Sequence, residues 1–310
     1  MTEVSVETRF LHAIEMGLGA WQWGDRFVWQ YGHGYGAEEV RQAFQASIQE
    51  GIRFVDTAEL YGNGLSERLL GRFLKETDQP VILATKYFPW PWRFGRGSLL
   101  RALQGSLTRI GVESVDLYQI HWPSPIMSVD LMMEGVVECV KRGMTRTVGV
   151  SNFGPSRMLA AYSALARHNI PLASNQVPYS LLNRSVEKNG TLARCKELGI
   201  RLIAYSPIEK GMLTGKYGIE HPPPGMRGRN YASLLPKLPP LLKKMTEIGQ
   251  DHGGKSNAQV ALNWVICKGA LPIPGAKNAE QAQQNAGALG WRLTDGEIAL
   301  LDEGSDQVMK

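Results

Sequence analysis

The chain of 310 residues contains only three cysteines, Cys139, Cys195 and Cys267, which lie far apart and each fall within a helical pattern. An odd number of scattered cysteines argues against a disulfide framework or a thiolate metal site, so we expect free thiols in a reducing compartment and no bound metal. The first residues also lack the apolar core of a secretory signal peptide. We therefore expect a cytoplasmic protein.

Long apolar runs and clustered charge are also missing. No stretch approaches the roughly 18 uninterrupted apolar residues of a membrane-spanning helix, so we expect no membrane association. The net charge is only +5, and lysine and arginine are scattered along the chain. Because there is no basic helix and no sheet face that combines basic and aromatic residues, we expect no nucleic-acid partner.

What the chain does contain is a regular alternation of short apolar segments and helical patterns. Continuous Val, Ile and Leu runs are typical of parallel strands buried on both faces, and eight such segments occur, at residues 16–20, 52–55, 81–85, 115–120, 145–150, 172–176, 201–205 and 270–273. No change in composition marks a domain linker. The pattern predicts an α/β fold in which residues 1–310 form one (β/α)8 TIM barrel. We also expect an irregular N-terminal hairpin up to about Ile14 and extra helices at the C-terminus.

A doubly wound sheet is the competing fold, and its glycine-rich phosphate loop should follow the first strand. Gly17 and Gly19 begin such a motif, but the third glycine falls at Gly24, two positions late. The segment from Gly211 to Tyr217 is one residue short of a P-loop and ends in Tyr rather than Ser or Thr. The barrel is therefore the preferred interpretation.

Four polar residues follow predicted strands: Asp56, Tyr61, Lys86 and His121. They should meet, because the strands of a barrel end on one shared face. A free phenol has a pKa of about 10; a neighbouring ammonium should lower it, and a carboxylate should keep that ammonium charged. The tyrosine would then be a usable general acid, with a neutral histidine donating a second hydrogen bond to the same oxygen. This set suits protonation of a carbonyl oxygen while the carbon receives hydride.

Six motifs, in order along nearly the whole chain, identify a family that the sequence resembles. They span residues 51–62 (GIRFVDTAELYG), 116–123 (DLYQIHWP), 149–153 (GVSNF), 176–179 (QVPY), 204–207 (AYSP) and 273–277 (IPGAK), the last running on to Gln284 and Asn285. With Lys86 correctly placed between the first two, the chain resembles the aldo-keto reductases.

The resemblance implies a catalytic tetrad in which Tyr61 is the general acid and His121 orients the carbonyl, while Lys86, anchored by Asp56, lowers the pKa of the tyrosine. It also implies a set of cofactor-binding residues, from the nicotinamide end through the diphosphate to the adenosine: Ser151, Asn152, Gln176, Tyr205, Ser206, Ile208, Gly211, Leu213, Gly215, Gly275, Ala276, Lys277, Gln281, Gln284 and Asn285. We further expect four tryptophans near the catalytic face, Trp21, Trp90, Trp92 and Trp122, to wall an apolar substrate pocket.

The implied activity is NADPH-dependent reduction of aldehydes or ketones by a monomer acting on a small carbonyl substrate. Lys277 and a helix N-terminus near residue 278 favour NADP over NAD, because both attract a 2′-phosphate. Two departures from the family pattern weaken that preference: Gln281 replaces a frequent arginine and Gln284 the usual glutamate. The alternatives are an NAD-linked alcohol or sugar dehydrogenase of the same family, and a cofactor-binding regulatory module resembling channel subunits.

Overall fold

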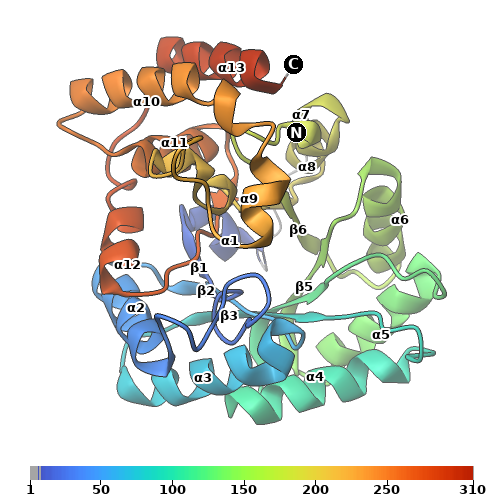
Figure 1. Cartoon of the computed structure of the whole chain (residues 1–310). Helices are drawn as coiled ribbons and strands as arrows, with labels where there is room; N and C mark the ends of the chain where they lie inside the picture. Colours follow the sequence, from blue (N-terminus) through green and yellow to red (C-terminus); the bar gives the residue numbers. More distant parts are fainter. Residues whose placement is uncertain (1–5, 7, 310) are drawn as a thin grey trace.

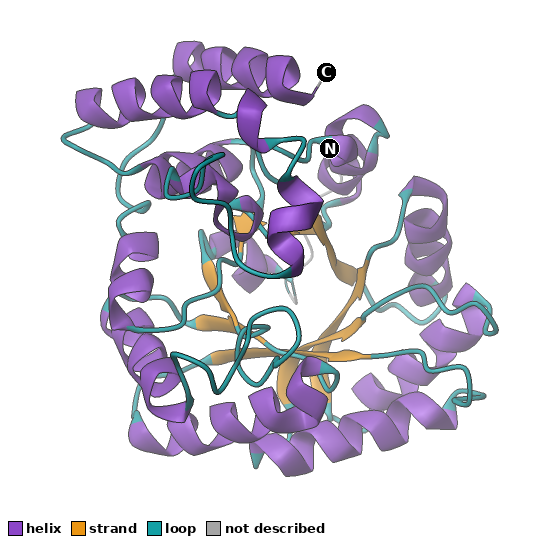
Figure 2. Cartoon of the chain, in the orientation of Figure 1, coloured by secondary structure: helices purple, strands orange, loops and turns teal. Residues whose placement is uncertain are grey.

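Eight parallel strands pair in chain order, from β1 to β8, in a computed structural model that describes residues 6 and 8–309. The strands are β1 Gly17–Gly19, β2 Phe54–Asp56, β3 Ile82–Tyr87, β4 Val115–Ile120, β5 Thr145–Ser151, β6 Leu172–Pro178, β7 Arg201–Tyr205 and β8 Leu271–Pro272. Figure 2 shows the helices as an outer layer around these strands. The predicted (β/α)8 barrel is confirmed.

The barrel closes where the first strand meets the segment after the last. Gly19 pairs with Gly275 in a parallel bridge, and the Gly19 amide donates a hydrogen bond of 3.0 Å to the Pro274 carbonyl. A Cβ atom at Gly19 would lie 2.7 Å from the Ile273 carbonyl oxygen, so the closure requires glycine at this position.

Helices connect successive strands and continue after the last strand. They are α2 Ala37–Gln49, α3 Leu65–Phe73, α4 Gly97–Ile110, α5 Val129–Lys141, α6 Pro155–Ala166, α7 Ser185–Lys188, α8 Thr191–Leu198, α9 Met226–Tyr231, α10 Pro239–Asp251, α11 Asn257–Cys267, α12 Ala279–Ala286 and α13 Asp295–Met309. Short 3-10 turns occupy Tyr61–Gly64, Leu74–Glu76, Glu209–Thr214 and Leu235–Lys237. The expected extra C-terminal helices are present, with α10 and α13 packed against each other outside the ring (Figure 1).

The N-terminal hairpin prediction is wrong for the part of it that the structure describes, while residues 1–5 and 7 lie outside the described residues. The segment Arg9–Ala13 forms a short helix, α1. Its Leu11 is fully buried in a cluster that includes Phe54 and Leu117 from the barrel interior. Phe10 and Ile14 pack against the same cluster, so this short helix buries apolar side chains where a hairpin was expected.

Two short helices, α7 and α8, connect β6 to β7. Gly190 lies between them with φ of +80°, a left-handed conformation that ends a right-handed helix. The three cysteines lie in α5, α8 and α11 as free thiols, two buried and Cys267 half-buried. Among the described residues, no helix is long and apolar enough to cross a membrane, and no group of three His, Cys, Asp or Glu side chains could hold a metal ion.

Candidate active site

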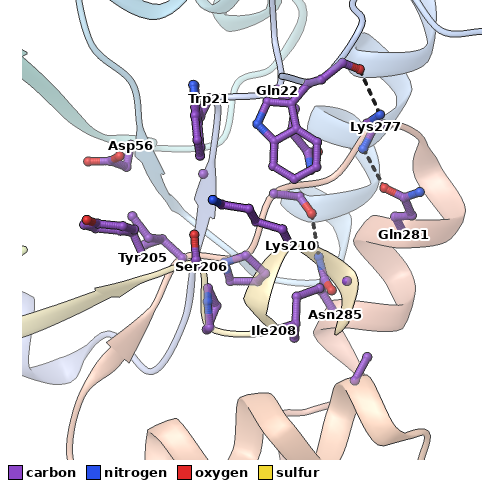
Figure 3. A pocket seen from close by; sticks show the side chains of 18 of the residues that line it. Trp21, Gln22, Asp56, Tyr205, Ser206, Ile208, Lys210, Lys277, Gln281 and Asn285 are labelled. Atoms are coloured by element: carbon purple, nitrogen blue, oxygen red, sulfur yellow. Dashed lines mark hydrogen bonds between the residues drawn. The ribbon is translucent and has the colours of Figure 1, made fainter. Parts of the chain in front are cut away.

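A cavity of about 570 Å³ lies at the carboxyl ends of the strands, the face on which TIM barrels carry their active sites. It extends from Asp56, Tyr61 and His121 to Lys277 and Gln281 beside α12. Figure 3 shows side chains from these two ends lining one continuous space. Its volume falls within the range of roughly 300–1,000 Å³ that is usual for ligand and cofactor sites.

The tetrad predicted from the sequence is assembled around the buried ammonium of Lys86. Its Nζ donates hydrogen bonds to Asp56 Oδ2 at 2.5 Å, to the Thr57 carbonyl at 2.9 Å and to the Tyr61 hydroxyl at 3.1 Å. These bonds use all three of its donors. The ring of His121 lies edge-on to that of Tyr61, with centroids 5.6 Å apart. Four residues from separate strands and turns therefore meet at one point.

Local backbone structure explains why these side chains converge. Asp56 is the last residue of β2, Lys86 lies near the end of β3, and His121 directly follows β4. Tyr61 begins a 3-10 turn in which Gly62 has φ of +54°. A Cβ atom on Gly62 would lie 2.8 Å from the backbone of Gly24, so glycine lets the β1 loop press against the tyrosine turn.

Two side-chain amides, one from β4 and one from β6, complete the surroundings of the Asp56 carboxylate. Its Oδ1 accepts hydrogen bonds from Gln176 Nε2 at 2.8 Å and from Gln119 Nε2 at 3.1 Å. Both glutamines are buried. A buried ion pair is favourable only when its remaining hydrogen-bonding capacity is satisfied, and these amides satisfy the side of Asp56 that Lys86 does not.

Gln119 was not predicted as a site residue, although the sequence contains a signal for it. It lies two residues before His121, and alternate residues of a strand point to the same side. Since His121 was expected at the barrel mouth, Gln119 could have been placed one layer below it. Gln176 was expected to hold a nicotinamide carboxamide; it lines the cavity and its own amide is directed to Asp56.

The surroundings of the tetrad shift its pKa values in directions that define its protonation. Burial, and then the positive charge of Lys86, lower the pKa of His121 well below its usual value, so the imidazole is neutral near pH 7, as predicted. Burial lowers the pKa of Lys86 and the Asp56 carboxylate opposes that shift. Burial, and then Asp56, raise the pKa of Tyr61 well above its usual value.

The expectation that the pKa of Tyr61 lies below its usual value is therefore wrong for this structure. Burial is the larger cause, and the Asp56 carboxylate, which lies 2.5 Å from the Lys86 ammonium, opposes the effect of that ammonium on the phenol. A tyrosine in this position is fully protonated near neutrality. It could therefore donate a proton.

Beside the tetrad, residues of β5, β6 and β7 form a continuous hydrogen-bonded set. Ser151 Oγ donates to the Gln176 carbonyl at 2.8 Å, and the Tyr205 hydroxyl donates to Asn152 Oδ1 at 2.9 Å. Asn152 Nδ2 in turn donates to the His121 carbonyl at 3.0 Å. These residues, expected at the nicotinamide end, all line the cavity next to Tyr61.

The segment after β7 crosses the cavity as a strained turn. Ser206, Glu209 and Lys210 all have positive φ, between +46° and +53°, and Gly211 follows with φ of +95°. Consecutive left-handed residues other than glycine are costly, and such strain is concentrated at functional sites. Of the residues predicted here, Ser206, Ile208 and Gly211 line the cavity. Leu213 is fully buried and Gly215 is exposed, and neither lines the cavity as predicted.

At the far end, the segment from Gly275 to α12 provides the other predicted residues. Lys277, Gln281, Gln284, Asn285 and Gly275 line the cavity, whereas Ala276 is buried and its carbonyl accepts a hydrogen bond from Trp23. Asn278 caps α12 by accepting a hydrogen bond from the Gln281 amide, which confirms the predicted helix start near residue 278. The Gln281 side chain accepts from the Lys277 amide at 3.0 Å.

Two cations from the long segment after β7 join Lys277 at this end, and the sequence did not reveal them. Arg227 lies over the Trp29 ring at 5.1 Å, and its buried Nε has no hydrogen-bond partner. Burial, Arg227 and Lys216 together lower the pKa of Lys277 to about 8. Within the described chain, none of these three cations forms an ion pair with a carboxylate. The far end of the cavity therefore has the positive charge to bind an anion.

A family model described as "Aldo/keto reductase family" matches residues 15–306. The chain belongs to the aldo/keto reductase family. It is 40% identical to "Pyridoxal reductase, chloroplastic" from Arabidopsis thaliana over 97% of this chain and 85% of that protein. It is 31% identical to an Escherichia coli (strain K12) L-glyceraldehyde 3-phosphate reductase, over 94% and 92% of the two chains. A Klebsiella pneumoniae aldo/keto reductase solved in complex with NADP and acetate is 28% identical, with a TM-score of 0.73 over 93% of this chain and 90% of that one.

Within this aldo/keto reductase, only two of the four predicted pocket tryptophans face the cavity. Trp21 and Trp122 line it, the former beside the Tyr61 ring. Trp90 and Trp92 instead stack on each other, with centroids 4.9 Å apart, and Trp92 is 67% exposed. Their loop follows Phe88, whose ring contacts His121, so the chain turns outward just after the site. The prediction that Trp90 and Trp92 wall this cavity is not supported by their positions.

Proposed function

We propose that this protein uses NADPH to reduce aldehydes or ketones to alcohols. The observation that carries the proposal is the Lys86 ammonium bonded at once to Asp56 and to the Tyr61 hydroxyl, beside a neutral His121 at the edge of the cavity. NADPH, when bound, supplies hydride to the carbonyl carbon. The protein then has to supply one proton to the carbonyl oxygen, and Tyr61 is the protonated group available.

Each tetrad residue has a distinct part in that proton transfer. Tyr61 donates its phenolic proton to the carbonyl oxygen, which His121 orients by a second hydrogen bond. The phenolate that remains is stabilised by Lys86 Nζ at 3.1 Å. Asp56 holds the ammonium in place and keeps it charged despite its burial.

Several observations support NADP rather than NAD as the cofactor. The extra 2′-phosphate of NADP is a dianion near neutrality. Three cations that form no ion pair with a carboxylate in the described chain lie at the end of the cavity beside α12, namely Lys216, Arg227 and Lys277. The unpartnered Nε of Arg227 is a donor still free to bind such a group. These cations compensate for Gln281, which stands where an arginine is frequent in the family. The solved relative in complex with NADP agrees with this assignment.

The substrate we propose is an aldehyde whose flat or apolar part rests between Trp21 and Trp122. Both indoles line the cavity next to Tyr61 and His121. Pyridoxal, an aromatic aldehyde, is the substrate in the name of the plant relative. A panel should therefore contain pyridoxal, simple aromatic aldehydes and small 2-oxoaldehydes.

The test combines a binding and a turnover measurement on the purified protein. Tryptophan fluorescence is titrated with NADPH and with NADH, and the aldehyde panel is then assayed by the loss of NADPH absorbance. We expect NADPH to bind at least tenfold more tightly than NADH and one aldehyde to be reduced catalytically. Tight NADPH binding without turnover of any carbonyl would contradict the proposal and favour a cofactor-binding regulatory module. Equal binding of the two cofactors with oxidation of an alcohol would favour the NAD-linked alternative.

A further inference from the structure

The loop between β1 and α2 contains a carboxylate, Asp25, that lies behind the wall of the cavity and does not line it. Among the described residues it forms no ion pair, and its two oxygens are used by the loop itself. Oδ2 accepts a hydrogen bond from Trp21 Nε1 at 3.1 Å. Oδ1 accepts from the backbone amides of Val28 at 2.7 Å and Trp29 at 3.2 Å. One side chain therefore holds two tryptophans of the same loop.

These two tryptophans belong to different ends of the cavity. Both line it, and their rings meet edge to face with centroids 5.7 Å apart. The Trp21 ring lies 6.5 Å from the ring of Tyr61, at the catalytic end. The Trp29 carbonyl accepts a hydrogen bond of 3.1 Å from Lys277 Nζ, at the far end (Figure 3). Asp25 thus connects the wall proposed to contact the aldehyde with the lysine proposed to bind the 2′-phosphate.

The contact with Trp29 fixes the Lys277 ammonium and still leaves it able to bind an anion. An ammonium has three donors, and one of them is used by the Trp29 carbonyl. Lys277 Nζ also lies 4.3 Å from the centroid of the Tyr35 ring, whose hydroxyl donates to the Gln22 carbonyl at 2.8 Å. Because Asp25 holds the Trp29 amide, it fixes the part of the loop that holds Lys277 in place.

We propose that Asp25 is a positioning residue for both ends of the cavity. Through Oδ2 it orients the Trp21 indole against the aldehyde, and through Oδ1 it places the Trp29 carbonyl that holds Lys277. This inference rests on the proposed reductase function. The two roles can be separated, because asparagine keeps an oxygen that accepts from the Val28 and Trp29 amides, whereas its Nδ2 is a donor and does not accept from Trp21 Nε1. Alanine removes both contacts.

The experiment measures the KM and kcat for benzaldehyde at saturating NADPH, and the Kd for NADPH by calorimetric titration. Asp25→Asn should raise the KM roughly 3- to 10-fold and leave kcat and the NADPH Kd within about twofold. Asp25→Ala should raise both the KM and the NADPH Kd by roughly 3- to 10-fold. In a Trp21→Phe background, which has no indole N–H, Asp25→Asn should have no further effect on the KM. Asp251→Asn, at the exposed end of α10, is the matched control and should change none of these values.

Three results would overturn the inference. The first is an unchanged KM in Asp25→Asn. The second is a KM that rises equally with Asp25→Asn whether residue 21 is Trp or Phe, since Asp25 would then not act through the indole. The third is an unchanged NADPH Kd in Asp25→Ala, which would remove its role at the far end. Failure of the proposed function is distinguishable, because the wild type would then reduce no carbonyl of the panel, and the NADPH Kd of Asp25→Ala would still test the far end.

Discussion

The two ends of the cavity differ in whether their cations are balanced by nearby carboxylates. At the catalytic end the buried ammonium of Lys86 is fully matched, by Asp56 at 2.5 Å and by two oxygen acceptors at 2.9 and 3.1 Å. At the far end Lys277, Lys216 and Arg227 face one another with no carboxylate in an ion pair with any of them in the described chain, and the pKa of Lys277 falls to about 8. The charges at the catalytic end are balanced without a ligand, whereas the cations at the far end need an anionic ligand to balance them.

This difference distinguishes the groups proposed to transfer a proton from the groups proposed to bind the anionic cofactor. A matched and buried set holds its geometry without a ligand, and preorganised geometry is what proton transfer requires. An unmatched set of cations is destabilised by mutual repulsion, and an anionic ligand relieves that repulsion. Because such a ligand binds only the folded state, its binding also stabilises the fold. Substitutions at the two ends should therefore affect different measurements.

The largest effect should come from Tyr61→Phe, which removes the proton donor and leaves the ring. We expect kcat to fall by roughly 10²–10⁴-fold, the usual contribution of a positioned general acid. NADPH affinity, measured by fluorescence titration, should change by no more than about twofold, because Phe can keep the ring contact with His121. Wild-type turnover in this variant would show that another group supplies the proton.

Lys86→Met should remove the buried ion pair with Asp56 and lower the stability of the fold. It leaves Asp56 buried without a counter-ion, and removing one partner of a buried ion pair costs about 3–5 kcal/mol. The free energy of unfolding, from denaturant titration of the ligand-free protein, is the measurement. Lys277→Met is the comparison at the unmatched end, where removing one of three repelling charges should leave stability equal or raise it. Equal losses in both variants would contradict the distinction between the two ends.

Lys277→Met should instead weaken NADPH binding. A hydrogen bond to a charged group contributes about 1.5–3 kcal/mol, so we expect the Kd for NADPH to rise by roughly 10- to 150-fold. The Kd for NADH should change much less, since NADH lacks the 2′-phosphate. If both cofactors lose affinity equally, Lys277 contacts a part that they share.

The smallest effect should be a pH dependence of the affinity for NADPH. The pKa of Lys277 is lowered from 10.5 to about 8, so its ammonium loses its proton as the pH rises through about 8. NADPH binding should weaken across that range and NADH binding should stay nearly constant, as titrations between about pH 6.5 and 9.5 would show. The contribution of Lys277 to the ligand-free fold has the opposite sign. Between pH 8 and 10.5 the unfolded chain binds the proton and the folded chain does not, so stability rises with pH in that window.

Strand order and the positions of the proposed catalytic residues were predictable because both depend on local sequence. The apolar strand runs and the polar residue after each of them located Asp56, Lys86 and His121, and a barrel brings all strand ends to one face. Tyr61 was recognisable because it lies on a short turn beside Asp56. The positions of side chains were predicted wrongly where their contacts depend on the path of a long loop. Trp90 and Trp92 lie on a loop whose direction no periodicity encodes, and they stack on each other away from the cavity.

By itself, the sequence determined the fold, the tetrad and the family, since these follow from short motifs in fixed order. Only the tertiary structure decided how charge is distributed over the cavity. Arg227 and Lys216 reach the far end from a segment before α10. The pKa of Tyr61 was likewise a tertiary outcome. Its direction depends on burial and on the nearby Asp56 carboxylate, and both depend on contacts between residues that are remote in the chain.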